Sequence, residues 1–309
     1  GQHLAVLRGE TSECFEALCR RHRVATVHAF AEVCSEEVAI ERRVAEVLKA
    51  AGARLDLSWG FTLYHRGDLP PRTSFKTYSS FRRAVQEEPG AAVRPEVPPP
   101  RSWRPPPAPV HEEPGAGRLP EDLGFSDLVF PPRDDRAPVE FVGGERVALA
   151  WVNTYVSKFL ERYYVGATNT MRKGKSAIGR DATTKFSPWL AHGCVSARRI
   201  YHLVEKLERQ RRASDATGWL KHELVWRDYL RFAGMAEVWG DSIFKRDGIG
   251  GALHGIEWVR DGAVASERLE RWIEGRTGYP FVDAFMRELA ATGYTTHCGR
   301  ECACWFLVR

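Results

Sequence analysis

Short apolar runs alternate with amphipathic stretches over residues 1–88. The runs at 3–7 and 25–30 predict buried parallel strands, and residues 55–65 predict another strand region. Apolar positions at helical spacing predict helices at 10–22, 35–51 and 78–85, the second with an apolar face formed by Ala39, Val44, Val47 and Leu48. This alternation predicts a doubly wound α/β sheet. Three strands are fewer than a complete mononucleotide-binding domain has, so we expect a partial one.

Residues 89–140 differ in composition from the rest of the chain. Fourteen of the 18 prolines lie there, including two Pro-Pro-Pro runs. Such a segment is typical of an extended, semi-rigid linker, and a linker is a better interpretation than a ligand for an SH3-like module. From Gly143 to the end, the apolar spacing is helical. We therefore predict a partial α/β domain at 1–88, a proline-rich linker at 89–140 and an all-helical domain at 141–309.

Within the helical part, residues 196–212 combine an apolar stripe with a basic face. The inward positions are expected to be Ile200, Leu203, Val204 and Leu207, with arginines on the other side. Those arginines form either a solvated face or a surface that follows a phosphate backbone.

Bulk composition narrows the class of protein. The 309 residues leave room for two domains, and a net charge of +5 permits an anionic partner without requiring one. No run of 18 apolar residues predicts a membrane span, and the first residues lack a signal-peptide layout. The seven cysteines lack disulfide-framework spacing, which suits a reducing intracellular compartment. We expect no metal site, because zinc-site spacing is absent among His297, Cys298, Cys302 and Cys304.

The segment 219–231 carries a carboxylate between two indoles. It contains neither Gly nor Pro and predicts a helix with one stripe formed by Trp219, Glu223, Trp226 and Leu230. The ten tryptophans of the chain either fill cores or stack on a planar ligand or on bases. A Glu is costly to bury in an apolar face. Glu223 is therefore either an edge residue paired with Arg227 or a functional carboxylate.

Residues 183–193 predict a helix start next to a phosphate-binding loop. Ser187 suits the N-cap, and Pro188 suits the first helical position. The hydroxyls of Thr183 and Thr184 and the ammonium of Lys185 precede them. Unpaired backbone N–H groups at such an end suit phosphate, although Ser-Pro also starts many helices that bind nothing.

Together, these two segments resemble the photolyase/cryptochrome family, in which they cradle FAD. The stretch 275–293, which begins Gly-Arg-Thr-Gly-Tyr-Pro-Phe, resembles the next signature of that family and follows in the same order. Phe-Val-Gly-Gly-Glu at 141–145 and Lys-Phe-Ser at 185–187 resemble the DASH cryptochrome branch.

The resemblance implies a flavoprotein in which blue light drives an electron from reduced FAD to a cyclobutane pyrimidine dimer. The cofactor supplies the chemistry, and the protein supplies orientation and electrostatics. The dimer leaves the base stack more easily in a single strand, so single-stranded DNA is the expected partner. The protein itself is expected to be a monomer. Methenyltetrahydrofolate is implied as a possible antenna. A blue-light photoreceptor without repair activity is the alternative, and a nucleic-acid-binding protein without flavin is a third hypothesis.

Position by position, the resemblance implies roles for single residues. Glu223 matches the carboxylate that hydrogen-bonds the dimer, and Trp226 matches the aromatic ring that stacks on it. The Tyr near the flavin diphosphate matches Tyr164, or Tyr163 in another register. FAD contacts are further implied for Thr183, Thr184, Lys185, Phe186, Ser187, Arg227 and Arg300, and DNA contacts for Glu223, Trp226, Arg227, His297 and Arg300.

Two further assignments have plain structural alternatives. Glu36, in the run Cys-Ser-Glu-Glu, resembles the Glu that contacts the antenna folate, and it is also an ordinary acid in the first turn of a helix. Trp258 resembles the outermost tryptophan of an electron relay, and it also suits core packing.

The sequence departs from the family's pattern at several places. His297, Cys298 and Glu301 stand where Asn, Arg and, in the DASH branch, Gln are usual, which favours the photoreceptor alternative. An insertion around 171–179 is longer than usual. The family's first strand and its C-terminal flavin-facing part have no counterpart, so the sequence suggests a fragment of a longer photolyase-like protein.

Overall fold

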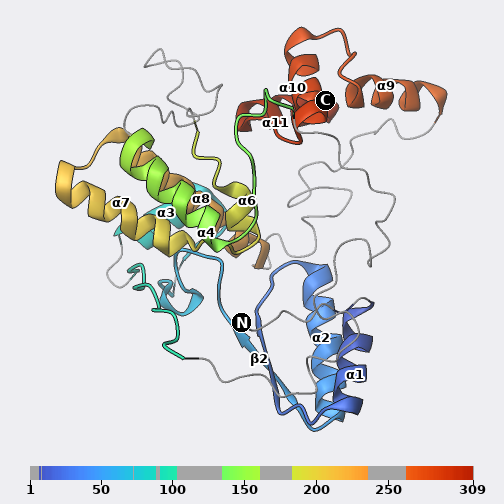
Figure 1. The fold of residues 1–309 in the computed structure, drawn as a ribbon, viewed down its shortest axis with the longest axis vertical. Coiled ribbons are helices and arrows are strands. Elements are labelled where there is room, and N and C mark those ends of the chain that lie inside the picture. Colours follow the sequence, from blue (N-terminus) through green and yellow to red (C-terminus); the bar gives the residue numbers. More distant parts are fainter. Residues whose placement is uncertain are drawn as a thin grey trace. The chain divides into compact units, whose positions relative to one another are not determined.

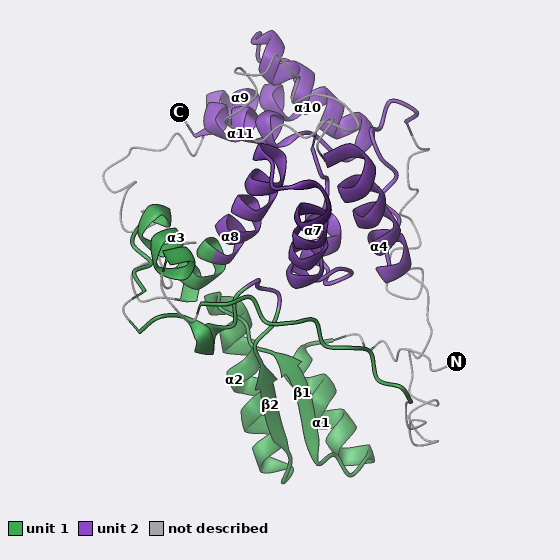
Figure 2. Ribbon diagram, turned by 90° about the vertical axis from the view of Figure 1, so that its left-hand side faces the viewer, with its two compact units in different colours: residues 1–60, 64–131, 229–250 green, residues 61–63, 132–228, 251–309 purple. Residues whose placement is uncertain are grey.

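The computed structural model describes residues 7, 9–71, 73–87, 91–102, 134–160, 183–235 and 262–308 (Figure 1). The chain divides into two compact units built from discontinuous segments (Figure 2). Unit 1 comprises residues 1–60, 64–131 and 229–250, and unit 2 comprises residues 61–63, 132–228 and 251–309. This division assigns 61–63 and 229–250 differently from the boundaries expected from the sequence.

Unit 1 contains a parallel two-stranded sheet with helices beside it (Figure 2). In chain order its elements are α1 (Thr11–Arg21), β1 (Thr26–Phe30), α2 (Ser35–Ala50), β2 (Arg54–Ser58), the 3₁₀ turn η1 (Arg66–Asp68) and α3 (Tyr78–Glu87). The register runs from Thr26 opposite Arg54 to Phe30 opposite Ser58. The predicted α/β alternation is thus confirmed. Residues 3–6 of the first predicted strand lie outside the described part.

Three local predictions for unit 1 need correction or refinement. β2 ends at Ser58 rather than near residue 65, because Trp59 turns into an aromatic core and Phe61 adopts a left-handed φ of 64°. Ala39 is exposed, whereas Val44 and Leu48 are the buried positions of α2. The first helix begins at Thr11, one residue later than predicted, because Glu10 is its N-cap and its carboxylate accepts hydrogen bonds from the N–H groups of Ser12 and Glu13.

The aromatic core of unit 1 combines residues far apart in the sequence. Phe81 from α3 and Phe232 are both fully buried, with ring centroids 5.8 Å apart. Phe232 also stacks on Trp59 at 5.3 Å, and the Arg231 guanidinium lies 5.4 Å from the centre of the same indole. Because Phe232 fills this core, residues 229–235 belong to unit 1.

The described part of unit 2 contains helices and loops but no strand, as predicted. Its elements are α4 (Glu145–Thr154), the π-helical turn η4 (Tyr155–Phe159), α6 (Ser187–Ala191), α7 (Ala197–Arg211), the first two-thirds of α8 (Asp215–Met235), α9 (Ala263–Ile273), α10 (Pro280–Thr292) and α11 (His297–Leu307). Tyr155 is fully buried, and its ring meets the Phe186 ring edge-on at 5.6 Å. Over the described residues, no helix is both long and apolar enough to span a bilayer.

Side-chain caps define where several helices of unit 2 begin. At the start of α8, the Ser214 N–H donates to the Thr217 hydroxyl (2.9 Å) and the Thr217 N–H donates to the Ser214 hydroxyl (3.3 Å). The Thr296 hydroxyl accepts from the Gly299 N–H at 3.3 Å and starts α11. Gly293 ends α10 in a left-handed conformation, with φ at 69°.

α7 places its apolar stripe almost as predicted. Ile200, Val204 and Leu207 are buried, whereas Leu203 is only half-buried. Ala197 is buried as well, so the buried stripe reaches the first residue of the helix. The basic face is also less uniform than expected. Whereas the arginines at the C-terminal end are exposed, Arg198 is half-buried and donates from Nε to the Leu63 carbonyl (3.2 Å).

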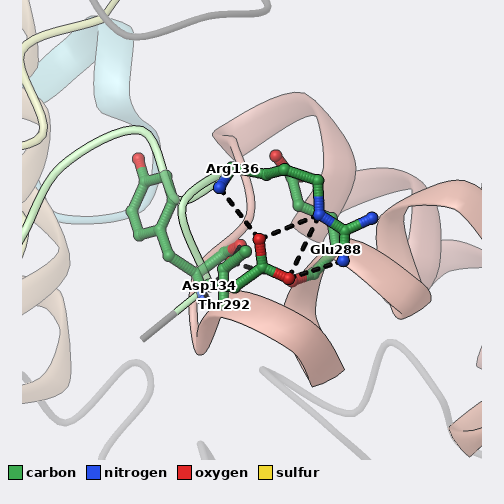
Figure 3. A network of polar contacts seen from close by, with 5 residues as sticks. Asp134, Arg136, Glu288 and Thr292 are labelled. Carbon is green, nitrogen blue, oxygen red and sulfur yellow. Dashed lines mark hydrogen bonds and ion pairs between the residues drawn. The ribbon is translucent and has the colours of Figure 1, made fainter. Parts of the chain in front are cut away.

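The described ends of the predicted linker contain neither helix nor strand. At its beginning, Arg94 holds the Asp68 carboxylate through two hydrogen bonds of 2.6 and 2.7 Å. At its end, Asp134 accepts from the Arg136 backbone N–H and from its Nε, each at 2.8 Å. Figure 3 shows this pair beside the last turn of α10, where the Thr292 hydroxyl donates to the Glu288 carbonyl. The Arg136 hydrogen bonds lower the pKa of Asp134 to about 2.

Candidate functional site

The outer face of α8 carries the indole stripe that the sequence predicts. Trp219, Glu223, Trp226 and Leu230 share one side of the helix, but that side is not a core. Glu223 is exposed, and Trp226 and Leu230 are 43% and 44% exposed. The cost of burying Glu223 therefore does not arise. The face presents a carboxylate and an indole to whatever binds there.

The residues directly after Trp226 turn inward and hold the segment 61–63. The Asp228 carboxylate is completely buried and accepts a hydrogen bond of 2.8 Å from the Leu63 N–H. The Arg227 guanidinium donates to the Phe61 carbonyl and, at 3.4 Å, to the Leu190 carbonyl at the end of α6. Because one side chain contacts both places, Arg227 fixes the distance between α8 and α6.

The loop 183–187 buries polar residues. Thr184 and Lys185 are 9% and 3% exposed, and Lys185 has a left-handed φ of 53°. A conformation that is rare for a residue with a Cβ, combined with burial of a long cationic side chain, is typical of a functional position. The Lys185 ammonium lies 3.3 Å from the Thr183 hydroxyl, and the Trp151 indole N–H donates to the Thr184 carbonyl at 2.8 Å.

The predicted start of α6 is shifted by one residue. Ser187 is the first helical residue, not the N-cap, and Phe186 occupies the cap position without a side-chain hydrogen bond. Phe186 is drawn into the core by Tyr155, which leaves Ser187 exposed at the helix end. The hydroxyl of Ser187 is therefore available at the surface instead of being used as a cap.

Aromatic contacts connect α6 to the start of α11. The Phe141 ring lies 5.5 Å from the Trp189 ring and 5.1 Å from the Tyr294 ring. Arg300 stacks over Tyr294 at 5.7 Å and donates to the Thr295 carbonyl at 2.7 Å. Loop 183–187, the part of α8 that carries Glu223 and Trp226, and the N-terminal turn of α11 all belong to unit 2.

The polar groups of loop 183–187 fit an anionic ligand. The loop combines the hydroxyls of Thr183 and Ser187 with the ammonium of a buried lysine whose backbone is left-handed, and hydroxyl and ammonium donors suit phosphate oxygens. The neighbouring α8 face adds an exposed indole, which suits a planar ring.

Comparison with known proteins finds two matching family models and several similar chains. Residues 1–102 match the family model for DNA photolyase, and residues 219–309 match the model for the FAD binding domain of DNA photolyase. Cryptochrome DASH from Gloeobacter violaceus is 39% identical over 312 residues, covering 100% of this chain and 58% of that protein. The chloroplastic/mitochondrial Cryptochrome DASH of Oryza sativa subsp. japonica is 36% identical over 329 residues, covering 100% of this chain and 53% of that protein.

A solved structure gives the same result. The Synechocystis sp. cryptochrome superposes with a TM-score of 0.77 at 30% identity, covering 99% of this chain and 60% of that one. The chain belongs to the photolyase/cryptochrome family. Its relatives within the family are the DASH cryptochromes, and it spans little more than half of their length.

Some family-type positions lie outside the described residues, and one belongs to the other unit. Tyr164, Trp258 and the insertion at 171–179 lie outside the described residues. Glu36 is exposed in the first turn of α2, in unit 1, whereas the other described candidates belong to unit 2. His297 is exposed, with its Nε2 atom 3.9 Å from the Glu301 carboxylate. At these positions the chain therefore pairs an imidazole with an acid.

Sequence reasoning missed Asp228 and the segment 61–63. An Asp in an amphipathic helix is usually assigned to the surface. The available signal was its spacing: Asp228 lies four residues after Leu224 and eight after Leu220, which are both buried. A carboxylate in line with two core leucines indicates a buried partner.

Proposed function

We propose that this chain contributes the flavin- and lesion-contacting surfaces of a DASH-type flavoprotein that transfers an electron from reduced FAD to cyclobutane pyrimidine dimers in single-stranded DNA. The observation that carries the proposal is the outward presentation of Glu223 and Trp226 by a helix whose opposite face is fully packed. An exposed indole beside a carboxylate offers stacking and hydrogen bonding to a base that has left its stack.

The polar loop would hold the cofactor. Lys185 would neutralise the flavin diphosphate, and the hydroxyls of Thr183, Thr184 and Ser187 would donate to its oxygens, with Tyr164 nearby. Phe186 would support the loop from the core side, and Arg300 would contribute a further FAD contact. When bound, reduced FAD supplies the light-excited electron. This chain's own residues orient both partners and exclude water.

α8 and α11 would receive the lesion. Glu223 would accept hydrogen bonds from the base edge, and Trp226 would stack against the dimer. Arg227, which links α8 to the Leu190 carbonyl of α6 and to the Phe61 carbonyl, would also contact flavin and DNA. His297 and Arg300 would contact the DNA backbone. We further propose Trp258 as an outer electron relay, Glu36 as a contact for methenyltetrahydrofolate, and the sequence-based boundaries at 88 and 140 as domain limits.

A second function is favoured by one observation. The acid of Glu301 next to His297, with Cys298 at the adjacent position, gives the lesion side fewer cations than the family pattern has. A blue-light photoreceptor with the same flavin loop fits that difference. Light would then reduce the flavin without splitting a dimer.

The experiment begins with the whole chain, purified in the dark. Acid-released flavin is quantified, and loss of dimers from a single-stranded oligonucleotide is followed under blue light. Lys185→Asn tolerates the left-handed backbone but removes the ammonium, so flavin affinity is expected to fall about tenfold or more. Lys206→Asn, which changes an exposed lysine of α7, is the matched control and should leave flavin content unchanged.

The outcomes separate the candidate functions. Trp226→Ala is expected to keep the flavin and to weaken binding of the dimer-containing strand about tenfold, because one stacking contact is lost. Flavin photoreduction without loss of dimers would favour the photoreceptor function over the repair function. Absence of flavin from the chain, or equal flavin loss in the Lys185 and Lys206 variants, would contradict the assignment of the loop.

A further inference from the structure

The N-terminal half of α11 places two thiols on one face of the helix. Cys298 and Cys302 are four residues apart, and no other two of the seven cysteines have that spacing. All seven are free thiols. Cys298 is exposed, and Cys302 is half-buried against the cluster formed by Val282, Met286 and Ala303. One thiol is thus accessible, and the other is fixed by packing.

The helix that carries the pair is held at both ends of the thiol face. The Thr296 hydroxyl caps the Gly299 N–H, and the Trp272 indole N–H donates to the Ala303 carbonyl at 3.0 Å. Gly299 lies so close to Phe285 of α10 that a Cβ at this position would collide with the ring. These contacts keep the first turns of α11 helical, so the two thiols keep their helical spacing.

The helical spacing of Cys298 and Cys302 is too wide for a disulfide between them. Cβ atoms four residues apart on a helix are about 5–6 Å from each other. A disulfide requires a Cβ separation of about 3.5–4.5 Å. Bond formation would therefore unwind the turn that Thr296, Gly299 and Trp272 hold in place. A single ion between the sulfurs needs no such change, because metal–sulfur bonds of about 2.3 Å span the larger gap.

The two thiols are too few ligands for most metal ions, and this narrows the choice of metal. Within the part of the chain that the structure describes, no group of three or more His, Cys, Asp or Glu side chains is arranged to hold a metal. Zinc is almost always held by four ligands in structural sites, and calcium and magnesium require oxygen ligands. Monovalent copper is selected by soft thiolates, and two of them satisfy it.

We propose that Cys298 and Cys302 form a two-thiolate binding site for monovalent copper on α11. The site is additional to the flavin and DNA surfaces and does not depend on them. Binding exchanges protons for the ion: one Cu⁺ forms two Cu–S bonds, two S–H bonds break, and two protons go to solvent. No electron is transferred.

The test uses the reduced whole chain under nitrogen, with Cu⁺ supplied from its coloured complex with bicinchoninate. Decolorisation is expected to reveal one Cu⁺ per chain bound more tightly than by any single thiol, and two thiols fewer should react with Ellman's reagent. Cys298→Ser and Cys302→Ala should each weaken this binding about 100-fold or more, because the second ligand is lost. Cys304→Ser, which removes an exposed thiol of the same helix, should leave it unchanged.

Two results would overturn the site. One is equal Cu⁺ affinity in the wild type and in Cys298→Ser. Because Cys298 is exposed, this variant is expected to fold normally, so misfolding would not complicate the comparison. The other is a loss in Cys304→Ser as large as that in Cys298→Ser. Circular dichroism checks that the Cys302→Ala variant, which changes a half-buried residue, keeps its helices. The readout uses neither light nor flavin, so its failure leaves the proposed function intact.

Discussion

The two faces of α8 treat the same residue types in opposite ways. On the inner face, Phe232 is fully buried and Asp228 is fully buried. On the outer face, Trp226 is 43% exposed and Glu223 is exposed as well. One helix therefore carries an aromatic residue and a carboxylate on each side, and only the inner pair is fully buried. The difference shows that apolar periodicity alone does not identify a core.

Loop 183–187 and the outer face of α8 differ in which residue types they bury. There a lysine and a threonine are buried, while the α8 face exposes an indole and a leucine. Polar groups inside and apolar groups outside are unfavourable for folding alone, so each departure has a reason elsewhere. The proposed phosphate contact at the loop and the proposed stacking on Trp226 would each account for one of these departures.

The largest effect is expected from the aromatic pair. Phe232→Ala should lower the free energy of unfolding by about 3–5 kcal/mol, because the ring packs on Trp59 and Phe81. Trp226→Ala should change it by about 0.5 kcal/mol or less, since the indole is largely at the surface. Urea denaturation followed by circular dichroism measures both. Equal destabilisation by the two substitutions would remove the distinction between the faces.

The carboxylate pair should give a smaller difference. Asp228→Ala leaves the buried Leu63 N–H without its acceptor and is expected to cost about 1–3 kcal/mol. Asp228→Asn keeps an oxygen acceptor and should recover part of that loss. Glu223→Ala should be close to neutral for stability. The same urea titrations compare all three, and a destabilising Glu223→Ala would show that the outer carboxylate has a structural role.

The smallest effect on stability is expected from a third carboxylate, that of Asp283 in α10. Its carboxylate accepts from the Thr277 hydroxyl (2.6 Å), the Thr277 N–H (2.8 Å) and the Gly278 N–H (3.1 Å). The Thr277 hydroxyl, followed by the backbone donors, lowers the pKa of Asp283. A lowered pKa stabilises the fold above the unfolded-state pKa, near 3.8, and that stability is lost as pH falls through the lower folded value.

Stability at several pH values checks this sign. Asp283→Asn should be less stable than the wild type at pH 7, and the gap should narrow once the pH falls below about 4. A gap that stays constant down to pH 2 would mean that the Thr277 hydrogen bonds do not favour the charged carboxylate.

The sequence predicts helix faces where apolar side chains decide them. Val44, Leu48, Ile200 and Val204 are buried as their spacing indicates, because aliphatic side chains gain only from burial. Trp226 was not predictable in this way, since an indole suits a core and a binding surface equally. Asp228 was missed because its burial depends on the Leu63 N–H, more than a hundred residues away.

Backbone details at the candidate site were also beyond the sequence. Lys185 and Phe61 both adopt left-handed conformations, which residue type gives no reason to expect. Ser187 has good N-cap chemistry, yet burial of Phe186 takes the cap position. The family resemblance indicated which residues to consider, but only the fold shows that Arg227 holds two carbonyls.

The assignment of residues 229–235 to the first unit has a consequence for dissecting the protein. Proteolysis within the proline-rich segment would not release an autonomous N-terminal half, since Trp59 and Phe81 would lose the ring of Phe232 that covers them. Two co-expressed halves should instead remain associated and be recovered as one species, with the end of α8 acting as the tether.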